Sequence, residues 1–290
     1  MNKMLNVLFS TTRQFNIGDE FILFGVIRLL REVFQYGLNP IIYNRNPDIR
    51  PDRRPIEALR DVKLSYTDAE AYEAAANFKI GFLDNSYKTS LDAQFLDLVV
   101  LAGTPEWSNS RCADLYRTVE KYDLPIIAVG IGNEIQEPNP TIMRNLNRFW
   151  LFTVRSPELV SALAEHFEHP PEYLPCPSLC GAPPEKIRSV NKVRHIGLIY
   201  SCDINRSRIG NCVTTETYHY LLLIYRELMK HYPKISFSVV CHYMDELPFA
   251  YSDFPEMKVL YSFDARDYYD IYQQFDMVIG ARVHGIGCAA

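Results

Sequence analysis

Short apolar runs alternate with helical patterns along most of the chain, and this alternation is the feature that most constrains its fold. The runs are rich in Val and Ile, and the segments between them place apolar side chains at helical spacing. Near-continuous apolar strands are typical of parallel sheets that helices cover on both faces. The pattern therefore predicts an α/β fold with doubly wound sheets. In the first half the predicted strands span 5–10, 40–44, 79–84, 96–103, 125–132 and 151–156, and the predicted helices span 19–36, 67–77, 110–122, 140–149 and 157–167.

A proline-rich stretch at 170–192 interrupts this alternation, which then starts again. We read the stretch as an inter-domain connection. The predicted organisation is an N-terminal Rossmann-like domain at 1–175, a linker at 176–193 and a C-terminal Rossmann-like domain at 194–290. The second domain has predicted strands at 194–201, 235–243, 257–262 and 276–285 and predicted helices at 214–231 and 266–274.

The second domain looks incomplete at its C-terminus, because "GIGCAA" reads as the opening turn of a helix. We expect one of three explanations for this ending. The closing elements are missing, another chain covers the exposed face, or the domain boundary lies elsewhere.

Composition excludes several classes of function. The net charge is −5 and no long basic block occurs, which argues against bulk nucleic-acid binding. No apolar stretch approaches the roughly 18 residues that a membrane span needs, and "MNKMLNVLFS" does not read as a secretory signal. The seven Cys are expected to be reduced, and the C-x-x-x-C spacing of Cys176 and Cys180 favours packing over metal binding. We expect a cytoplasmic protein without metal or cofactor. A peripheral place at the inner face of a membrane and a homo-oligomer stay open.

The stretch "NIGDE" places Asn16, Gly18 and Asp19 between the first predicted strand and the first predicted helix. Ligands of open α/β sheets bind at the carboxyl ends of strands, and unpaired N–H groups at a helix start attract anions. These three residues are therefore candidates for substrate binding. In the alternative interpretation, Gly18 makes the turn and Asp19 caps the helix.

A second polar group lies at the carboxyl end of the last predicted strand, in "GARVHGIG". If the strand continues through 285, Arg282 and His284 are two residues apart in extended backbone and face the same side. An arginine and a histidine at a strand end suit an anionic substrate and proton transfer. The alternative is a histidine satisfied inside the fold and an arginine paired with a surface carboxylate.

Arg155 comes at the end of another predicted strand, in "FTVRSPEL". The next residues, Ser156 and Pro157, are typical of a helix start. An arginine beside a helix start makes an electropositive spot that suits a phosphate or carboxylate. The alternative is an ion pair with Glu158.

The loop "LAGTPEW" follows the predicted strand at 96–103. Gly103 allows the backbone to approach a ligand closely. Glu106 and Trp107 could bind a sugar, by a hydrogen bond and by stacking. A turn whose tryptophan packs between domains explains the same residues equally well.

Taken in order, "NIGDE", "LAGTPEW", "AVGIG", "TVRSPE" and "DMVIGARVHG" resemble the polysaccharide pyruvyl transferase family over nearly the whole chain. The resemblance implies two Rossmann-like domains of the GT-B-like kind. It also implies transfer of an enolpyruvyl group from phosphoenolpyruvate to a sugar of a surface polysaccharide or its precursor, in cell-envelope biosynthesis. In the family, the residues matching Arg155, Arg282 and His284 serve phosphoenolpyruvate.

The chemistry implied by the resemblance fits these residue types. Two arginines can hold the anionic groups of phosphoenolpyruvate, and a charged His284 can act as general acid. Asp19 or Glu106 could accept the proton of a sugar hydroxyl. Two alternatives stay open: a GT-B-like glycosyltransferase whose arginines grip a nucleotide-sugar diphosphate, and a non-catalytic relative that keeps the fold.

Overall fold

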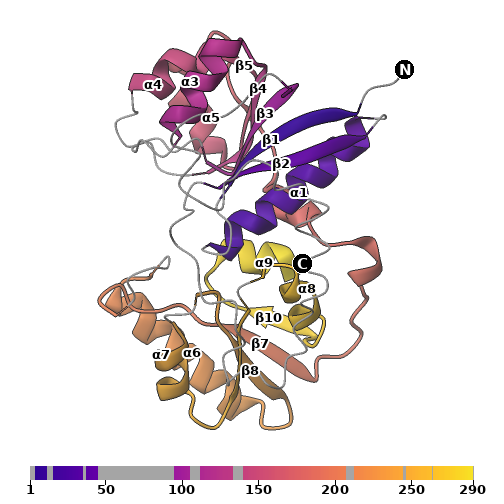
Figure 1. Ribbon diagram of the computed structural model, residues 1–290. Coiled ribbons are helices and arrows are strands. Elements are labelled where there is room, and N and C mark those ends of the chain that lie inside the picture. The colour runs from indigo at the N-terminus through magenta and orange to yellow at the C-terminus, as the bar shows by residue number, and fades with distance from the viewer. Residues whose placement is uncertain are drawn as a thin grey trace. The chain divides into compact units, whose positions relative to one another are not determined.

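Contacts divide the computed structural model into two compact units, each of which is described by itself (Figure 1). Of the described residues, the first unit takes those up to Gly181 except 16–18, and the second takes 16–18 and those from Ala182 onward. The domain and linker limits given above remain a prediction. The structure describes residues 4–11, 16–34, 37–44, 95–104, 112–132, 140–206, 212–243, 246–262 and 264–289. The predicted helix at 67–77 and the predicted strand at 79–84 lie outside these ranges.

The first unit contains a parallel sheet with the strand order β2-β1-β3-β4-β5-β6. The order reverses between β1 and β3, since the chain adds β2 on one side of β1 and β3 on the other. Such a switch point is where open α/β sheets bind ligands. The strands are β1 Leu5–Thr11, β2 Leu38–Asn44, β3 Leu98–Ala102, β4 Ile126–Ile131, β5 Phe149–Val154 and β6 Glu172–Tyr173.

Helices cover both faces of this sheet, as a doubly wound fold requires (Figure 1). Val7 and Phe9 of β1 pack in one cluster with α1, whereas Leu8 packs in another cluster with α3. Because neighbouring side chains of a strand point to opposite faces, these two clusters are the two faces of the sheet. The helices are α1 Ile17–Val33, α3 Ala113–Tyr122, α4 Pro140–Asn145 and α5 Pro157–Leu163, with short 3-10 segments η3 Leu146–Arg148, η4 Ala164–His166 and η5 Pro177–Cys180.

The second unit contains a parallel sheet with the order β10-β7-β8-β9. Residues of β7 pack against Tyr218, Leu222 and Tyr225 of α6 in its core. The side chain of Thr214 caps α6 by accepting a hydrogen bond from the Thr217 N–H at 3.2 Å. The elements are η6 Pro184–Lys186, β7 His195–Ile199, α6 Thr215–His231, β8 Ser236–Val240, α7 Leu247–Asp253, β9 Lys258–Leu260, α8 Asp267–Tyr272, β10 Met277–Ile279 and α9 Val283–Ala289.

The predicted strand at 276–285 is wrong in its second half. Strand β10 ends at Ile279, and α9 starts at Val283. Gly280 lies against the neighbouring strand β7, since a Cβ on Gly280 would come within 2.6 Å of Ile199 Cβ. Arg282 therefore precedes a helix and His284 lies in its first turn, so the extended two-residue spacing does not apply to them.

The alternative interpretation in which Asp19 caps the first helix is also wrong. Helix α1 starts at Ile17, so Gly18 and Asp19 lie in its first turn. The side-chain oxygen of Asn16 accepts a hydrogen bond from the Gly18 N–H at 3.0 Å. Asn16, not Asp19, thus occupies the capping position.

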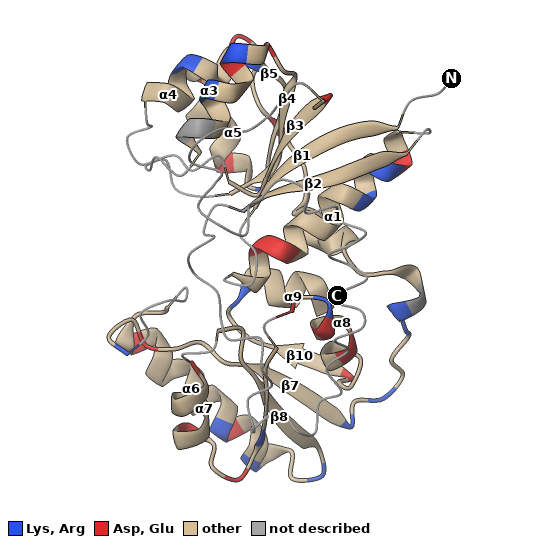
Figure 2. Cartoon of the chain, in the orientation of Figure 1, with Lys and Arg blue, Asp and Glu red and all other residues tan. Residues whose placement is uncertain are grey.

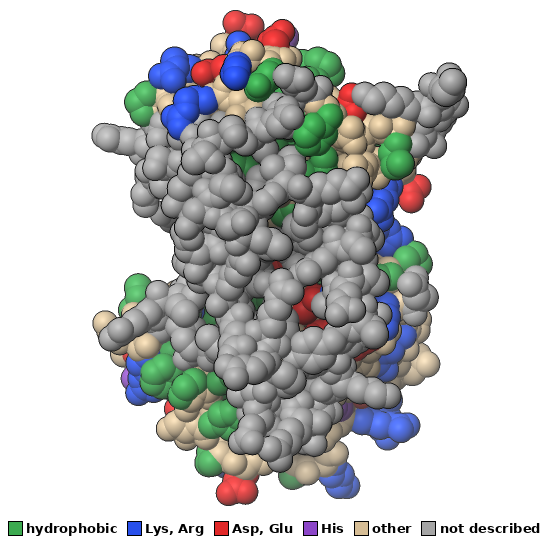
Figure 3. All heavy atoms as spheres, in the orientation of Figure 1, with side chains coloured by type: hydrophobic (Ala, Val, Ile, Leu, Met, Phe, Trp, Pro, Cys, Tyr) green, Lys and Arg blue, Asp and Glu red, His purple; other side chains and the backbone are tan. Residues whose placement is uncertain are grey.

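Basic and acidic residues are interspersed over the described elements in the view shown (Figure 2, Figure 3). The net charge of −5 gives no overall attraction for an anion. Any anionic ligand must be held by local cations. None of the helices in the described ranges is long and apolar enough to cross a membrane.

Candidate functional site

Buried polar side chains of the second unit gather at one edge of its sheet. They follow the carboxyl ends of β7, β8 and β9, and each is at most 5% exposed. Burying such groups costs free energy unless they are satisfied, so their concentration at a strand-end edge indicates a functional site. The residues are Ser201, Asp203, His242, Glu246, Ser262 and Asp264.

Arg282 lies at this edge, at the carboxyl end of β10. Its Nε donates to the carbonyl oxygen of Tyr200 at 3.1 Å, and its Nη2 donates to a carboxylate oxygen of Glu246. The ring of Tyr243 lies under the guanidinium, 4.8 Å from Cζ to the ring centre. Burial lowers the pKa of Arg282, but the Glu246 carboxylate, together with Tyr243 and Cys241, more than offsets this effect, so the pKa is raised. Arg282 is therefore a fixed cation whose partner is a buried carboxylate, not a surface one.

Glu246 forms hydrogen bonds to two separate segments at this edge of the sheet. One carboxylate oxygen pairs with Arg282, and the other accepts from the backbone N–H groups of His242 at 2.9 Å and Tyr243 at 3.1 Å. The Glu246 side chain is fully buried. It thereby connects the segment after β8 to the residue that precedes α9. Sequence reasoning missed Glu246, because its stretch "CHYMDELPF" matches no familiar motif.

His242 packs against the first turn of α9. Its Nε2 lies 2.6 Å from the hydroxyl oxygen of Tyr272, and a Cβ on Gly285 would come within 2.4 Å of its Cε1. Burial, with the nearby charges of Arg282 and His284, lowers the pKa of His242 well below its usual value. His242 is thus a neutral structural group, whereas His284 is only partly buried.

Gly18 and His284 approach each other closely. A Cβ on Gly18 would come within 2.3 Å of His284 Nδ1, and contact-based division groups Gly18 with the second unit. Only a residue without a side chain leaves room for the imidazole ring there. This places one of the predicted substrate-binding residues beside a predicted catalytic one.

Arg155 follows β5 in the first unit. A Cβ on Gly132 would come within 1.9 Å of Arg155 Nε, so the guanidinium lies directly over that glycine at the end of β4. Its Nη1 also lies 3.9 Å from Cys176 Sγ. Glu158, the predicted alternative partner, accepts a hydrogen bond from the Ser156 hydroxyl, which lowers the pKa of Glu158.

Asp19 and Gly103 of the first unit lie near its topological switch point, because the Thr11 hydroxyl at the end of β1 donates to the Asp19 carbonyl at 3.5 Å and Gly103 directly follows β3. Gly103 has φ +87°, and a Cβ there would come within 2.9 Å of Ile22 in α1. Both the backbone conformation and the packing therefore require glycine. Glu20, fully buried in the first turn of α1, is a further candidate that sequence reasoning missed. Glu106 and Trp107 lie outside the described residues.

A comparison with family models matches residues 16–289 to the family described as polysaccharide pyruvyl transferase. The chain belongs to the polysaccharide pyruvyl transferase family. The matched range includes every predicted site residue, from Asn16 to His284. Membership supports pyruvyl transfer to polysaccharide in general terms and a saccharide as acceptor.

The fold of this pyruvyl transferase family member resembles a 2.2 Å crystal structure of a Listeria monocytogenes protein assigned as a UDP-N-acetylglucosamine 2-epimerase. The TM-score is 0.52 at 11% sequence identity, and the match covers 99% of this chain and 77% of that one. At this identity the likeness concerns the fold alone, and it supports a GT-B-like α/β fold. Comparison with curated protein sequences found no match.

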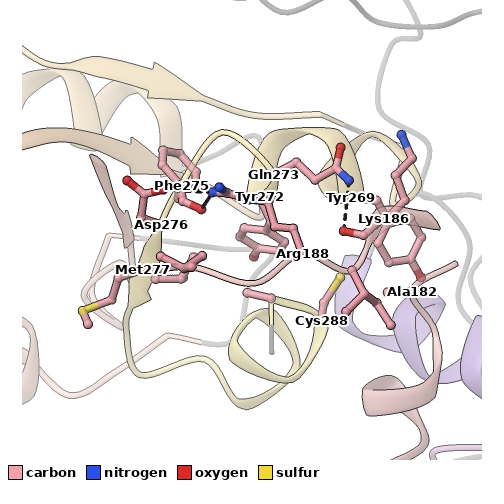
Figure 4. Close-up of a pocket in the computed structure, with 14 residues that line it drawn as sticks. Ala182, Lys186, Arg188, Tyr269, Tyr272, Gln273, Phe275, Asp276, Met277 and Cys288 are labelled. Carbon is pink, nitrogen blue, oxygen red and sulfur yellow. Dashed lines mark hydrogen bonds and ion pairs between the residues drawn. The ribbon is translucent and has the colours of Figure 1, made fainter. Parts of the chain in front are cut away.

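A further pocket lies in the second unit (Figure 4), and its lining residues do not include Arg282 or His284. Its volume is about 120 Å³, and its walls come from the 182–190 segment, α8, β10 and the end of α9. Its cations are engaged: Lys186 pairs with Asp270, and Arg188 donates to the Phe275 carbonyl and to Asp276. We interpret this pocket as a gap in the packing between the 182–190 segment and the sheet, not as a ligand site.

The described residues contain no group of three or more His, Cys, Asp and Glu side chains that could hold a metal ion. Of the C-x-x-x-C pair, Cys176 accepts a hydrogen bond from the Ser178 hydroxyl at 3.2 Å, and Cys180 is exposed.

Proposed function

We propose that this family member transfers the enolpyruvyl group of phosphoenolpyruvate to a sugar of a surface polysaccharide or its precursor and forms a pyruvate ketal. The observation that carries the proposal is the family match, which includes the Arg282 and His284 motif at the carboxyl end of β10. Arg155, over Gly132, is a second cation suited to an anionic group.

The reaction needs groups that hold anions and move protons. One sugar hydroxyl adds to C2 of phosphoenolpyruvate while a proton reaches the methylene carbon. A second hydroxyl then replaces phosphate at C2. One hydroxyl proton is thus balanced by the new methyl group, and the other leaves with phosphate. Arg155 and Arg282 suit the carboxylate and the leaving phosphate, and His284 suits proton delivery to the methylene carbon.

The acceptor side of the proposal uses the switch-point residues. Asp19 or Glu106 is the proposed base for a sugar hydroxyl. Asn16, Gly18 and Gly103 are proposed to line the substrate site, and Trp107 is proposed to stack on a sugar ring.

Calorimetric titration of phosphoenolpyruvate tests the donor assignment. We expect binding by the parent protein and its loss in Arg155→Ala and in Arg282→Lys, which keeps a charge beside Glu246 but loses the planar fork. The matched control is Arg148→Ala, because Arg148 is an exposed arginine paired with Asp123 and should not affect binding. Circular dichroism checks that each variant is folded.

His284→Gln tests the catalytic role separately from binding. We expect phosphoenolpyruvate to bind and phosphate release in the presence of a saccharide acceptor to fall by about 100-fold or more, which is typical of a lost general acid. A folded parent that binds a uridine or guanosine diphosphate, but not phosphoenolpyruvate, would instead support a nucleotide-sugar transferase.

A further inference from the structure

The hydroxyl of Ser201 is buried without a hydrogen-bond partner. Ser201 is 4% exposed, and its Oγ has no partner among the described residues. Other buried serines of the same unit are satisfied: the Ser238 hydroxyl lies 2.9 Å from His195 Nε2, and the Ser262 hydroxyl donates to Asp267 at 2.6 Å. An unpaired buried hydroxyl destabilises a fold. We therefore interpret the Ser201 hydroxyl as a group that hydrogen-bonds a ligand.

Ser201 lies just beyond the carboxyl end of β7, on the side of α9. The ladder continues past Ile199, because the Tyr200 N–H donates to the Val240 carbonyl at 2.8 Å. The Ile199 side chain faces Gly280 and Gly285, whereas the Tyr200 hydroxyl reaches Asp253 on the opposite side. Since side chains alternate along extended backbone, Ser201 faces the same side as Ile199.

The guanidinium of Arg282 is anchored directly beside this position. Its Nε donates to the Tyr200 carbonyl, which belongs to the peptide bond that joins Tyr200 to Ser201. Its Nε and Nη2 are occupied, but Nη1 makes no hydrogen bond within the described residues. A planar guanidinium bound along one edge presents its remaining N–H groups to an anion in a fixed direction.

We propose that the Ser201 hydroxyl and Arg282 Nη1 together bind one anionic group of the donor, a carboxylate or phosphate. This inference rests on the proposed function in one respect, which is that phosphoenolpyruvate is the donor. Ser201 is then a binding residue retained at a cost to the stability of the unliganded protein. No sequence motif points to it.

The test compares Ser201→Ala with Ser238→Ala by thermal unfolding and by calorimetric titration with phosphoenolpyruvate and with inorganic phosphate. Ser201→Ala removes an unsatisfied hydroxyl, so we expect an unchanged or higher Tm and roughly tenfold or greater loss of phosphoenolpyruvate affinity. Ser238→Ala removes a satisfied hydroxyl away from the strand end, so we expect a lower Tm and unchanged affinity. If inorganic phosphate binding falls in parallel in Ser201→Ala, the phosphate is the group that is held. If only phosphoenolpyruvate binding falls, it is the carboxylate.

Two results would overturn the inference while leaving the proposed function intact. One is a Ser201→Ala protein that binds phosphoenolpyruvate as the parent does. The other is a Tm that falls as far as in Ser238→Ala, which would reveal a partner for the hydroxyl in the unliganded protein. A folded parent that does not bind phosphoenolpyruvate would refute the donor assignment itself, and with it the role of Ser201.

Discussion

Removal of the Glu246 carboxylate is expected to be among the most damaging single changes in the second unit. In Glu246→Ala, the charge of Arg282 stays buried without its partner, since the Arg282 side chain is only 10% exposed. The backbone N–H groups of His242 and Tyr243 also lose their acceptor. Glu246→Ala therefore removes the contacts that join the segment after β8 to the residue before α9.

The expected loss can be estimated from these contacts. Breaking a buried ion pair by removing one partner costs about 3–5 kcal/mol. Each orphaned backbone N–H adds roughly 1 kcal/mol or more where water cannot reach it. We expect the free energy of unfolding to fall by about 5 kcal/mol or more, which at an m-value of about 2 kcal/mol/M lowers the urea midpoint by about 2.5 M or more.

Urea unfolding of Glu246→Ala beside Glu227→Ala tests this estimate. Glu227 is 48% exposed and pairs with Lys230 and His231 at 3.8 and 3.6 Å, so its loss should cost about 0.5 kcal/mol or less. In a double-mutant cycle, Glu246→Ala with Arg282→Ala should cost less than the sum of the two single changes. Additive losses, or a Glu246→Ala protein as stable as Glu227→Ala, would refute the coupling inferred from the structure.

Two further predictions concern other parts of the chain. Burial, chiefly, raises the pKa of Asp267 to about 6 from 3.8, despite the hydrogen bond from Ser262. The folded state therefore binds this proton more tightly than the unfolded state, and the contribution of Asp267 to the free energy of unfolding falls as pH rises from about 4 to about 6. Asp267→Asn, which keeps an oxygen acceptor, should be more stable than the parent by up to about 3 kcal/mol at about pH 7.5 and no more stable near pH 4, as measured by urea unfolding. An equal gain at both pH values would contradict the titration. Gly132→Ala should displace the Arg155 guanidinium, because the new Cβ would come within 1.9 Å of Nε, and calorimetry should detect weaker phosphoenolpyruvate binding in a folded protein. Undiminished affinity would remove Arg155 from the donor site.

The fold class could be predicted because the strands of a parallel sheet have a recognisable apolar pattern in the local sequence. Strands covered on both faces, such as β3 and β4, are apolar throughout, and helices such as α6 carry a cap signal at Thr214. The failures lie where long-range contacts decide. The end of β10 looks strand-like in sequence, but Arg282 bonds to Tyr200 and Glu246, and Gly285 packs on His242. These contacts, from residues far away in the chain, stabilise a helix start there.

Candidate site residues could be predicted only where they follow a recognisable strand. Arg155 and Arg282 were predicted from their place at the ends of predicted strands, and their roles stay predictions. Glu246 was not, because its importance comes from a partner 36 residues away. Ser201 was not, because an unpaired hydroxyl can be recognised only once the surrounding groups are placed.

The contacts of Arg282 suggest how such a site can select an anion in a protein with a net charge of −5. Glu246 neutralises much of the attraction that a bare guanidinium would exert on any passing anion. At the same time, Glu246 and the Tyr200 carbonyl bind one edge of the guanidinium and fix its orientation. An anion then gains most when its oxygens match the remaining N–H groups and the Ser201 hydroxyl at the same time. If the proposed anion binds here, its selection comes from hydrogen-bond geometry and not from net charge, which is why Arg282→Lys is a sharper test than a change in salt concentration.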